Sequence, residues 1–237
     1  MNITDKSLKG LFVTATGTGI GKTFFSCLLA STLKNLGIEV GVMKPFASGG
    51  IYKGVDKTRR LVSEDALKLK KAAGSLDSLS LINPICFKAP LCPYSASILE
   101  GKRISLNKVF NSYQTILKSH GFTIVEGIGG VRVPLAKNFE LADLILKMNL
   151  PALVVVSSKL GTLNHTLLTL DYLKRKKIRV LGIVLNFFNK RELVDRQNLN
   201  FFIKAKVPIL ATLPRTHPPS LDNSKLLTTI LSSCPIS

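Results

Sequence analysis

The stretch VTATGTGIGKTFFS, residues 13–26, carries glycine at three alternating positions, the last of them directly before Lys22 and Thr23. An apolar run precedes it and a segment of helical periodicity follows, so backbone N–H groups at the helix start would face the loop. Together with Lys22 these groups suit a phosphate, and Thr23 is placed to ligate magnesium. A Gly-rich turn without a ligand is the alternative, and the combination of features disfavours it. The stretch therefore predicts a phosphate-binding loop.

Three further charged residues lie at or near the ends of strand-like runs, where ligands bind in an open parallel sheet. Glu126 closes the run FTIVE, the Walker B pattern, whose carboxylate holds or orients magnesium, and the loop upstream favours this function. Lys44 closes EVGVMK, where a lysine that only reaches solvent fits about equally well. Asp65 begins a helix-like segment, and by itself fits an ordinary first-turn carboxylate better than a ligand.

Apolar runs of strand length alternate with helix-like segments along the chain. The runs are GLFVTA, EVGVMKP, FTIVEG, PALVVVS, IRVLGIVLN and VPILATLP, and the helix-like segments are 22–37, 63–74, 140–148, 163–175, 190–205 and 222–232. Near-continuous Val/Ile/Leu strands separated by helices indicate a parallel sheet covered on both faces. We therefore predict a doubly wound, P-loop NTPase-like α/β fold with a mainly parallel sheet of about seven strands, in a single domain over residues 1–237. Residues 76–104 read mostly as a long loop that covers a site or is disordered.

Composition narrows the class of protein. Of the 237 residues 46% are hydrophobic, and the mean hydropathy is +0.27, which indicates a well-packed globular chain. The longest apolar runs are far shorter than the roughly 18 residues that a membrane span needs, and no cleavable leader is visible. The four cysteines form no C-x-x-C pair, which favours reduced thiols. We expect a cytoplasmic protein with no membrane association.

The net charge of +19 raises the question of nucleic-acid binding. The lysines are spread along the chain, no basic stripe alternates with aromatic residues, and tryptophan is absent. We therefore expect no nucleic-acid partner, and part of the charge would help to collect anionic substrates.

These pieces together resemble the dethiobiotin synthetase family over nearly the whole length. The resemblance is carried, in order, by ATGTGIGKT (15–23), KPFASG (44–49), EDA (64–66), NP (83–84), APLCP (89–93), VEGIGG (125–130) with PL (134–135), and KLGTLNH (159–165). In this family the phosphate loop is one residue longer than usual, G-x5-G-K-T, so Ala15 occupies the place of the first glycine. A left-handed alanine would cost about 1–2 kcal/mol. We expect Ala15 to keep a negative φ while Gly17 and Gly19 make the turn.

The resemblance implies an ATP-dependent ligase of biotin biosynthesis, with ATP and magnesium as cofactors. Its reaction joins 7,8-diaminopelargonate and CO2 (or bicarbonate) to give dethiobiotin, ADP and phosphate, through a carbamate and a carbamic-phosphoric anhydride. Such a reaction needs charge neutralisation and in-line alignment of two anions more than covalent help from the protein.

The resemblance also assigns residues to roles. The catalytic set it implies is Lys22, Thr18, Lys44 and Ser48, and the magnesium ligands are Thr23, Asp65 and Glu126. The nucleotide would be bound by Gly17, Gly19, Ile20, Gly21, Lys22, Thr23, Asn186, Leu213 and Pro214. The substrate would be bound by Ser48, Gly129, Thr162, Leu163 and Asn164, the last three across the interface of a homodimer with shared active sites. For His165, a structural histidine is the better interpretation.

Two departures from the family pattern affect specificity. Ala89 and Cys92 replace an acid and a serine, which bears on the substrate side, and Tyr94 stands where histidine is common. Phe187 and Phe188 follow Asn186 where a polar residue is usual, which bears on purine selectivity.

The alternative function, from another class, is a ParA/MinD-like switch ATPase. Such proteins carry an extra lysine early in the phosphate loop, and here no lysine precedes Lys22 within TATGTGIGK.

Overall fold

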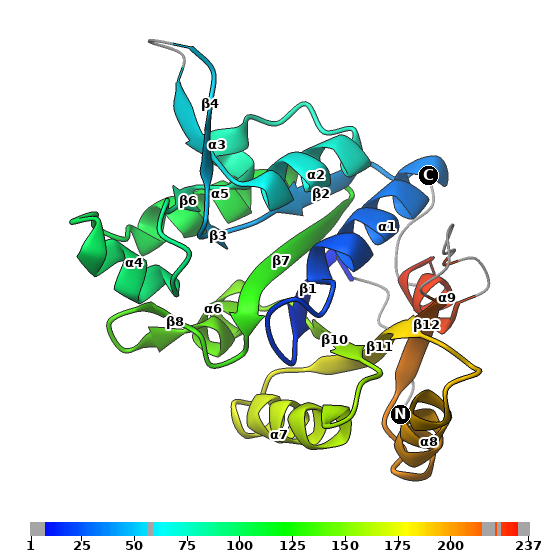
Figure 1. The fold of residues 1–237 in the computed structure, drawn as a ribbon. Helices are drawn as coiled ribbons and strands as arrows, with labels where there is room; N and C mark the ends of the chain where they lie inside the picture. The colour runs from blue at the N-terminus through cyan, green and yellow to red at the C-terminus, as the bar shows by residue number, and fades with distance from the viewer. Residues whose placement is uncertain (1–7, 56–58, 215–220, 222–223, 232–237) are drawn as a thin grey trace.

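A six-stranded parallel sheet forms the centre of this computed structural model, which describes residues 8–55, 59–214, 221 and 224–231 (Figure 1). Its strands are β1 (Gly10–Ala15), β2 (Val40–Met43), β7 (Phe122–Gly130), β10 (Ala152–Ser157), β11 (Val180–Phe188) and β12 (Ile209–Pro214). Their order is β12-β11-β10-β1-β7-β2, and every neighbouring pair is parallel. The six strands are the six apolar runs predicted from the sequence, one fewer than the expected seven.

Helices cover both faces of this sheet, as predicted for a doubly wound fold (Figure 1). On one face pack α1 (Lys22–Asn35), α2 (Glu64–Ala73) and α9 (Lys225–Leu231), and on the other α5 (Leu106–Ser119), α6 (Leu141–Met148), α7 (Thr162–Arg175) and α8 (Leu193–Lys204). Successive side chains of β1 alternate between the two layers, with Val13 in the α1 layer and Phe12 in the α6 layer. Both faces are therefore apolar, which explains the near-continuous hydrophobic strands.

The segment 76–104 contains more regular structure than predicted. It holds α3 (Leu79–Ile82), β6 (Ile85–Cys86) and α4 (Pro93–Leu99). The Ser78 hydroxyl accepts a hydrogen bond from Leu81 N at 3.2 Å and so caps α3, and Pro93 occupies the first turn of α4. The prolines scattered through 76–104 favoured a loop over these local helix signals. The expectation of a loop was wrong for the stretches that form α3, β6 and α4. The α5 helix was missed as well.

Short strands flank the main sheet. β6 pairs in parallel with β3 (Phe46–Ala47). Two antiparallel ribbons join β4 (Ile51–Lys53) to β5 (Arg60–Val62) and β8 (Pro134–Ala136) to β9 (Phe139–Glu140). The sheet of β3 and β6 matters most for function, because it holds the chain that leaves the end of β2.

Some predictions fall partly on residues outside the described ranges. The helix expected over 222–232 is seen as α9, and residues 222, 223 and 232 lie outside the described residues, as does Cys234. The other three cysteines are free thiols. Within the described part of the chain, no helix has the length and apolar character that a bilayer crossing requires.

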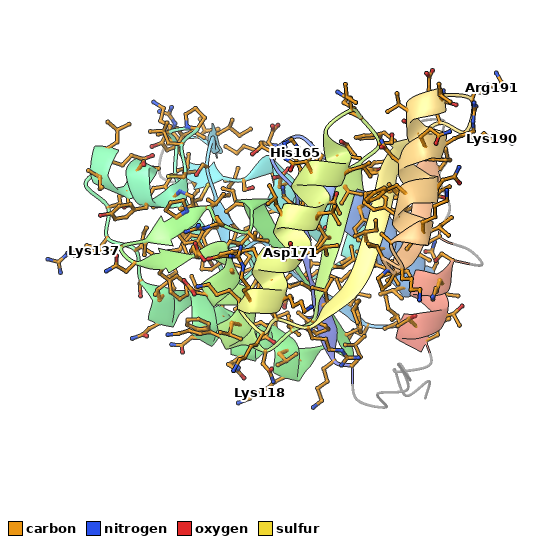
Figure 2. The ribbon with its side chains drawn as sticks, turned by 90° about the horizontal axis from the view of Figure 1, so that it is seen from below. Lys118, Lys137, His165, Asp171, Lys190 and Arg191 are labelled. Carbon is orange, nitrogen blue, oxygen red and sulfur yellow. The ribbon has the colours of Figure 1, made fainter. Side chains whose placement is uncertain are left out.

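The basic charge is distributed over several elements. Figure 2 shows Lys118 on α5, Lys137 between β8 and β9, and Lys190 and Arg191 before α8, all pointing away from the protein. All four side chains are exposed. This distribution agrees with the interpretation that the lysines lie on solvated faces.

Candidate active site

The phosphate loop leaves β1 at Ala15 and enters α1 at Lys22. Ala15 is not among the described residues with positive φ, as predicted. The left-handed residues are Gly19, at φ 74°, and Gly21, at φ 90°, so the turn is made by these two and the expected role of Gly17 was wrong. Gly21 caps α1, and a Cβ built there would lie 2.0 Å from Asn186 Nδ2, so only glycine fits.

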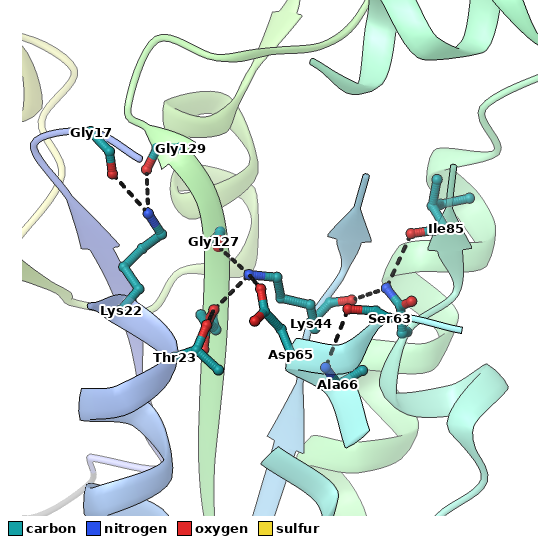
Figure 3. Close-up of polar contacts among 12 residues, drawn as sticks. Gly17, Lys22, Thr23, Lys44, Ser63, Asp65, Ala66, Ile85, Gly127 and Gly129 are labelled. Atoms are coloured by element: carbon teal, nitrogen blue, oxygen red, sulfur yellow. Dashed lines mark hydrogen bonds and ion pairs between the residues drawn. The ribbon is translucent and has the colours of Figure 1, made fainter. Parts of the chain in front are cut away.

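Lys22 is nearly buried, with its ammonium enclosed by backbone carbonyls. Its Nζ donates to Gly17 O at 2.9 Å and to Gly129 O at 3.0 Å (Figure 3). Burial and the neighbouring charge of Lys44 lower the pKa of Lys22 to about 8, against the opposing effect of nearby carboxylates. The P-loop lysine thus lies between the loop and the end of β7, and it is mostly cationic at neutral pH.

The side chains of Lys44, Asp65 and Thr23 converge on Glu126, although the four residues come from separate parts of the chain. Figure 3 shows Lys44, Asp65 and Thr23 at this point. The Nζ of Lys44 lies 2.5 Å from Glu126 Oε1 and 3.2 Å from Asp65 Oδ2. It also donates to Gly127 O at 3.0 Å, and the Thr23 hydroxyl donates to Glu126 Oε1 at 2.7 Å. The sheet order explains this convergence, because β7 lies between β1 and β2 and so places Glu126 between the phosphate loop and Lys44.

Asp65 reaches this point from the first turn of α2. Ser63 caps that helix by accepting a hydrogen bond from Ala66 N at 3.3 Å. Burial alone would raise the pKa of Asp65, but the ammonium of Lys44 lowers it below the ordinary value. Burial alone would likewise lower the pKa of Lys44, and the carboxylates of Glu126 and Asp65 outweigh it and raise that pKa. Asp65 and Lys44 are therefore both charged at neutral pH.

The oxygen atoms at this point fit a magnesium ion. Glu126 is fully buried and its second oxygen, Oε2, has no hydrogen-bond partner within the described residues. An unpaired buried carboxylate oxygen beside a threonine hydroxyl and a second carboxylate is a hard-ligand set of the kind that magnesium takes together with water and phosphate oxygens. Residues 8–55, 59–214, 221 and 224–231 hold no group of three or more His, Cys, Asp or Glu side chains suited to a metal, so this site would combine two carboxylates with a hydroxyl.

A cavity of about 570 Å³ opens above these residues. The predicted site residues that line it are Thr18, Gly19, Gly21, Lys22, Thr23, Lys44, Ser48, Asp65, Glu126 and Gly129. Its remaining wall is mostly apolar and was not predicted: Phe24, Ala47, Pro90, Leu91, Cys92, Ile128 and Val133. The cavity thus joins a charged floor to an apolar side, which suits an anionic ligand next to an aliphatic one.

Comparison with known proteins identifies the family. The AAA_26 family model, an AAA domain, matches residues 9–222. A protein named ATP-dependent dethiobiotin synthetase BioD from Endomicrobium trichonymphae is 40% identical over 92% of this chain and 96% of its own length. Proteins of the same name from Bacillus licheniformis and Methanocaldococcus jannaschii are 40% and 43% identical, over 88% and 74% of this chain and 86% and 78% of theirs. The chain belongs to the ATP-dependent dethiobiotin synthetase family.

Solved structures confirm the predicted P-loop NTPase-like fold. The MinC:MinD cell division complex of Aquifex aeolicus aligns with a TM-score of 0.52 at 16% identity, covering 96% of this chain and 87% of that chain. A ParA family ATPase from Chlorobium tepidum aligns at 0.50 and 15% identity, covering 88% and 86%. At such identities the similarity shows the fold alone. The family assignment rests on the similarity to the dethiobiotin synthetases.

A second group of predicted nucleotide residues lies beside the phosphate loop of the synthetase. Asn186 is fully buried at the end of β11, donates from Nδ2 to Ile20 O at 2.9 Å, and has no partner for Oδ1 in the described structure. It stands opposite Leu213 in the sheet, and Phe188 stands opposite Pro214. The structure thus brings Ile20, Asn186, Leu213 and Pro214 to one edge of the loop.

The departure at Phe187 shapes the same edge of the synthetase. Phe187 adopts a left-handed conformation, at φ 58°, which is unusual for an aromatic residue. Its ring packs 6.0 Å from the ring of Phe24, which lines the cavity. The two rings form an apolar wall next to Gly21.

Three of the residues predicted to bind the substrate lie apart from this cavity within one chain, whereas Ser48 and Gly129 line it. Thr162, Leu163 and Asn164 begin α7 and are not among the described residues that line the cavity. Thr162 is buried with its hydroxyl unpaired in the described structure, and Asn164 is exposed. His165 is exposed on the same helix and is not among the described residues that line the cavity (Figure 2).

Proposed function

We propose that this protein is an ATP-dependent cyclo-ligase that converts 7,8-diaminopelargonate, CO2 and ATP to dethiobiotin, ADP and phosphate. Membership of the dethiobiotin synthetase family supports this reaction. The observation that carries it is the arrangement of Lys22 and Lys44 on either side of Glu126 in one cavity. Two cations at one rim neutralise two ligands that repel each other, a carbamate and a triphosphate.

Each side chain of the cavity has its own role in the proposed reaction, according to its position. Lys22 binds the β- and γ-phosphates, with Thr18 on the transferred phosphoryl group and backbone N–H groups of Gly19 to Thr23 completing the loop. Lys44 is held protonated by its carboxylates, so it keeps a positive charge beside the carbamate as that anion approaches the γ-phosphate. Ser48, whose hydroxyl is buried and unpaired in the described chain, donates to the carbamate. The apolar wall of the cavity receives the aliphatic chain of the diamine.

Magnesium belongs to the proposal as the second source of positive charge. Thr23, Asp65 and Glu126 would hold it, since their oxygens meet at one point and Glu126 Oε2 is unpaired in the described structure. When bound, the ion neutralises charge on the phosphate oxygens.

The remaining parts of the proposal concern the whole protein. We infer a single domain over residues 1–237, supported by one sheet that joins β1 to β12. We also infer a cytoplasmic homodimer in which Thr162, Leu163 and Asn164 bind the carboxylate tail across the interface, together with Gly129 of the cavity. Asn186, Leu213 and Pro214 would contact the nucleobase.

The deciding experiment follows labelled bicarbonate into an acid-stable product, with and without 7,8-diaminopelargonate, while ATP hydrolysis is measured in parallel. The proposal expects label in dethiobiotin and ATP turnover that depends on the diamine. ATP turnover that is the same with and without the diamine, and that DNA or lipid vesicles stimulate, would contradict the proposal and favour a switch ATPase.

A further inference from the structure

The chain that carries Lys44 and Ser48 lies beyond the main sheet and is held by a second segment. β2 ends its pairing with β7 at Met43. From there residues 44–50 run beside residues 82–89, through Lys44 N to Ile82 O at 2.8 Å and Phe87 N to Ala47 O at 2.9 Å. The position of Lys44 therefore depends on segment 82–89 as much as on the sheet.

The carbonyl oxygen of Lys44 lies just before the paired residues of these segments. The pairing of β3 with β6 begins at Phe46 and Ile85. Pro84, which directly precedes Ile85, has no N–H to donate to a neighbouring carbonyl. An unmade hydrogen bond at a buried carbonyl costs about 1–3 kcal/mol.

The side chain of Asn83 donates to the carbonyl oxygen of Lys44. Its Nδ2 donates to Lys44 O at 2.6 Å and to Ile85 O at 3.1 Å (Figure 3). Both acceptors are carbonyl oxygens, which cannot donate, so the orientation of the amide is determined and both of its hydrogens are used. Asn83 thereby joins the end of β2 to the start of β6.

We propose that Asn83 is a positioning residue for Lys44. By joining the carbonyl oxygens of Lys44 and Ile85, it holds the Lys44 backbone where the side chain reaches Glu126, Asp65 and Gly127 O. The inference rests on the proposed role of Lys44 in the reaction. Displacement of a reacting group by about 1 Å lowers rates by up to roughly 10²-fold, so a loss of at least about 10-fold is expected without Asn83.

The test is a double-mutant cycle. Asn83→Ala should lower kcat for dethiobiotin formation at least about 10-fold, while the KM for ATP stays within about threefold, because the phosphate loop is untouched. In a Lys44→Ala background the same change should have no further effect on kcat. Asn111→Ala, an exposed asparagine on α5, is the matched control and should behave as wild type. Equal losses in both backgrounds would overturn the proposal, because they would mean that Asn83 acts independently of Lys44.

A second readout does not depend on the reaction. The buried, doubly paired ammonium of Lys44 should resist acylation by an activated ester, and Asn83→Ala should raise its labelling rate at least about fivefold relative to Lys22 in the same sample. Mass spectrometry gives both rates, and an unchanged ratio would contradict the positioning role even if the enzyme proved to have another substrate. Asn83→Asp, which keeps the shape but loses both donors, replaces Asn83→Ala in both measurements if the alanine variant does not fold.

Discussion

At the scale of single residues, one oxygen of Glu126 is crowded and the other is free of protein partners in the described structure. Oε1 accepts from Lys44 and Thr23, whereas Oε2 accepts from neither. This asymmetry gives the buried carboxylate a counter-charge without consuming its capacity to bind a cation. It also makes Lys44 important for stability as well as for the proposed reaction.

Lys44→Ala should therefore leave ATP binding largely intact but lower turnover by at least about 10²-fold, since groups that stabilise charge in the transition state commonly contribute that much. The same change leaves Glu126 buried beside Thr23 alone, so the free energy of unfolding should fall by a few kcal/mol, roughly 3. Calorimetric titration with ATP, turnover and urea unfolding check the three quantities. Lys118→Ala, exposed on α5, is the control, and unchanged turnover in Lys44→Ala would remove this lysine from the mechanism.

For Lys22 we expect the opposite effect, because removal of its charge should raise the stability of the nucleotide-free protein. Its pKa is lowered from 10.5 to about 8 by burial and by Lys44, so below pH 8 the folded protein carries a buried charge that the unfolded chain would hold in water. Between pH 8 and 10.5 the unfolded chain binds more protons, so the stability of the nucleotide-free protein should rise with pH, by up to roughly 3 kcal/mol.

Lys22→Met abolishes this dependence. Without nucleotide the variant should be more stable than wild type near pH 7, by about 1–2 kcal/mol, because the lost bonds to Gly17 O and Gly129 O offset part of the gain. The difference should shrink as the pH approaches 10. Urea unfolding at several pH values tests this, with exposed Lys174→Met as the control. A difference that stays constant with pH would show that Lys22 is not destabilised by burial.

At the scale of elements, the phosphate loop depends on glycine at one position more than at another. Gly21 has φ 90° and no room for a Cβ, which would overlap Asn186 Nδ2. Gly17 has no positive φ, and a Cβ there would find nothing within 4 Å. The two glycines look equivalent in the sequence, and the structure separates them.

Gly21→Ala should accordingly destabilise the nucleotide-free protein by at least about 2 kcal/mol, from backbone strain and displacement of Asn186. Gly17→Ala should change stability by less than about 0.5 kcal/mol. Denaturant unfolding of both variants without ATP makes the comparison, and equal losses would mean that the loop adopts another conformation in solution.

At the scale of the whole molecule, the cavity and the start of α7 belong to separate places in one chain. In the proposed homodimer, shared active sites would bring them together, and subunit mixing tests this. Lys44→Ala and Asn164→Ala each impair a different half of the site, so a mixed dimer contains one site with both native residues. Randomly mixed subunits should recover about one quarter of the wild-type activity, although each variant alone is poorly active.

Sedimentation of the wild-type protein should show a dimer in the same buffer. No recovery on mixing, with exchange of subunits demonstrated, would place Asn164 and Lys44 of the same chain in one site or remove Asn164 from it. The control is a mixture of Lys44→Ala with Lys118→Ala. Its activity should not exceed the activity contributed by the native sites of the Lys118→Ala subunits.

The sequence by itself determined the phosphate loop, the six strands and the position of Lys44 directly after a strand, because glycine spacing and hydrophobic periodicity are local properties. The expectation that Glu126 closes its strand was wrong, because β7 continues to Gly130. Only the tertiary structure decided that β7 lies between β1 and β2, so that Lys44, Asp65 and Thr23 converge on Glu126. It also revealed the bond from Asn83 to Lys44 O and the enclosure of Lys22 by Gly129 O. Such contacts join segments far apart in the chain, and they follow from sheet order and packing, which no local periodicity encodes.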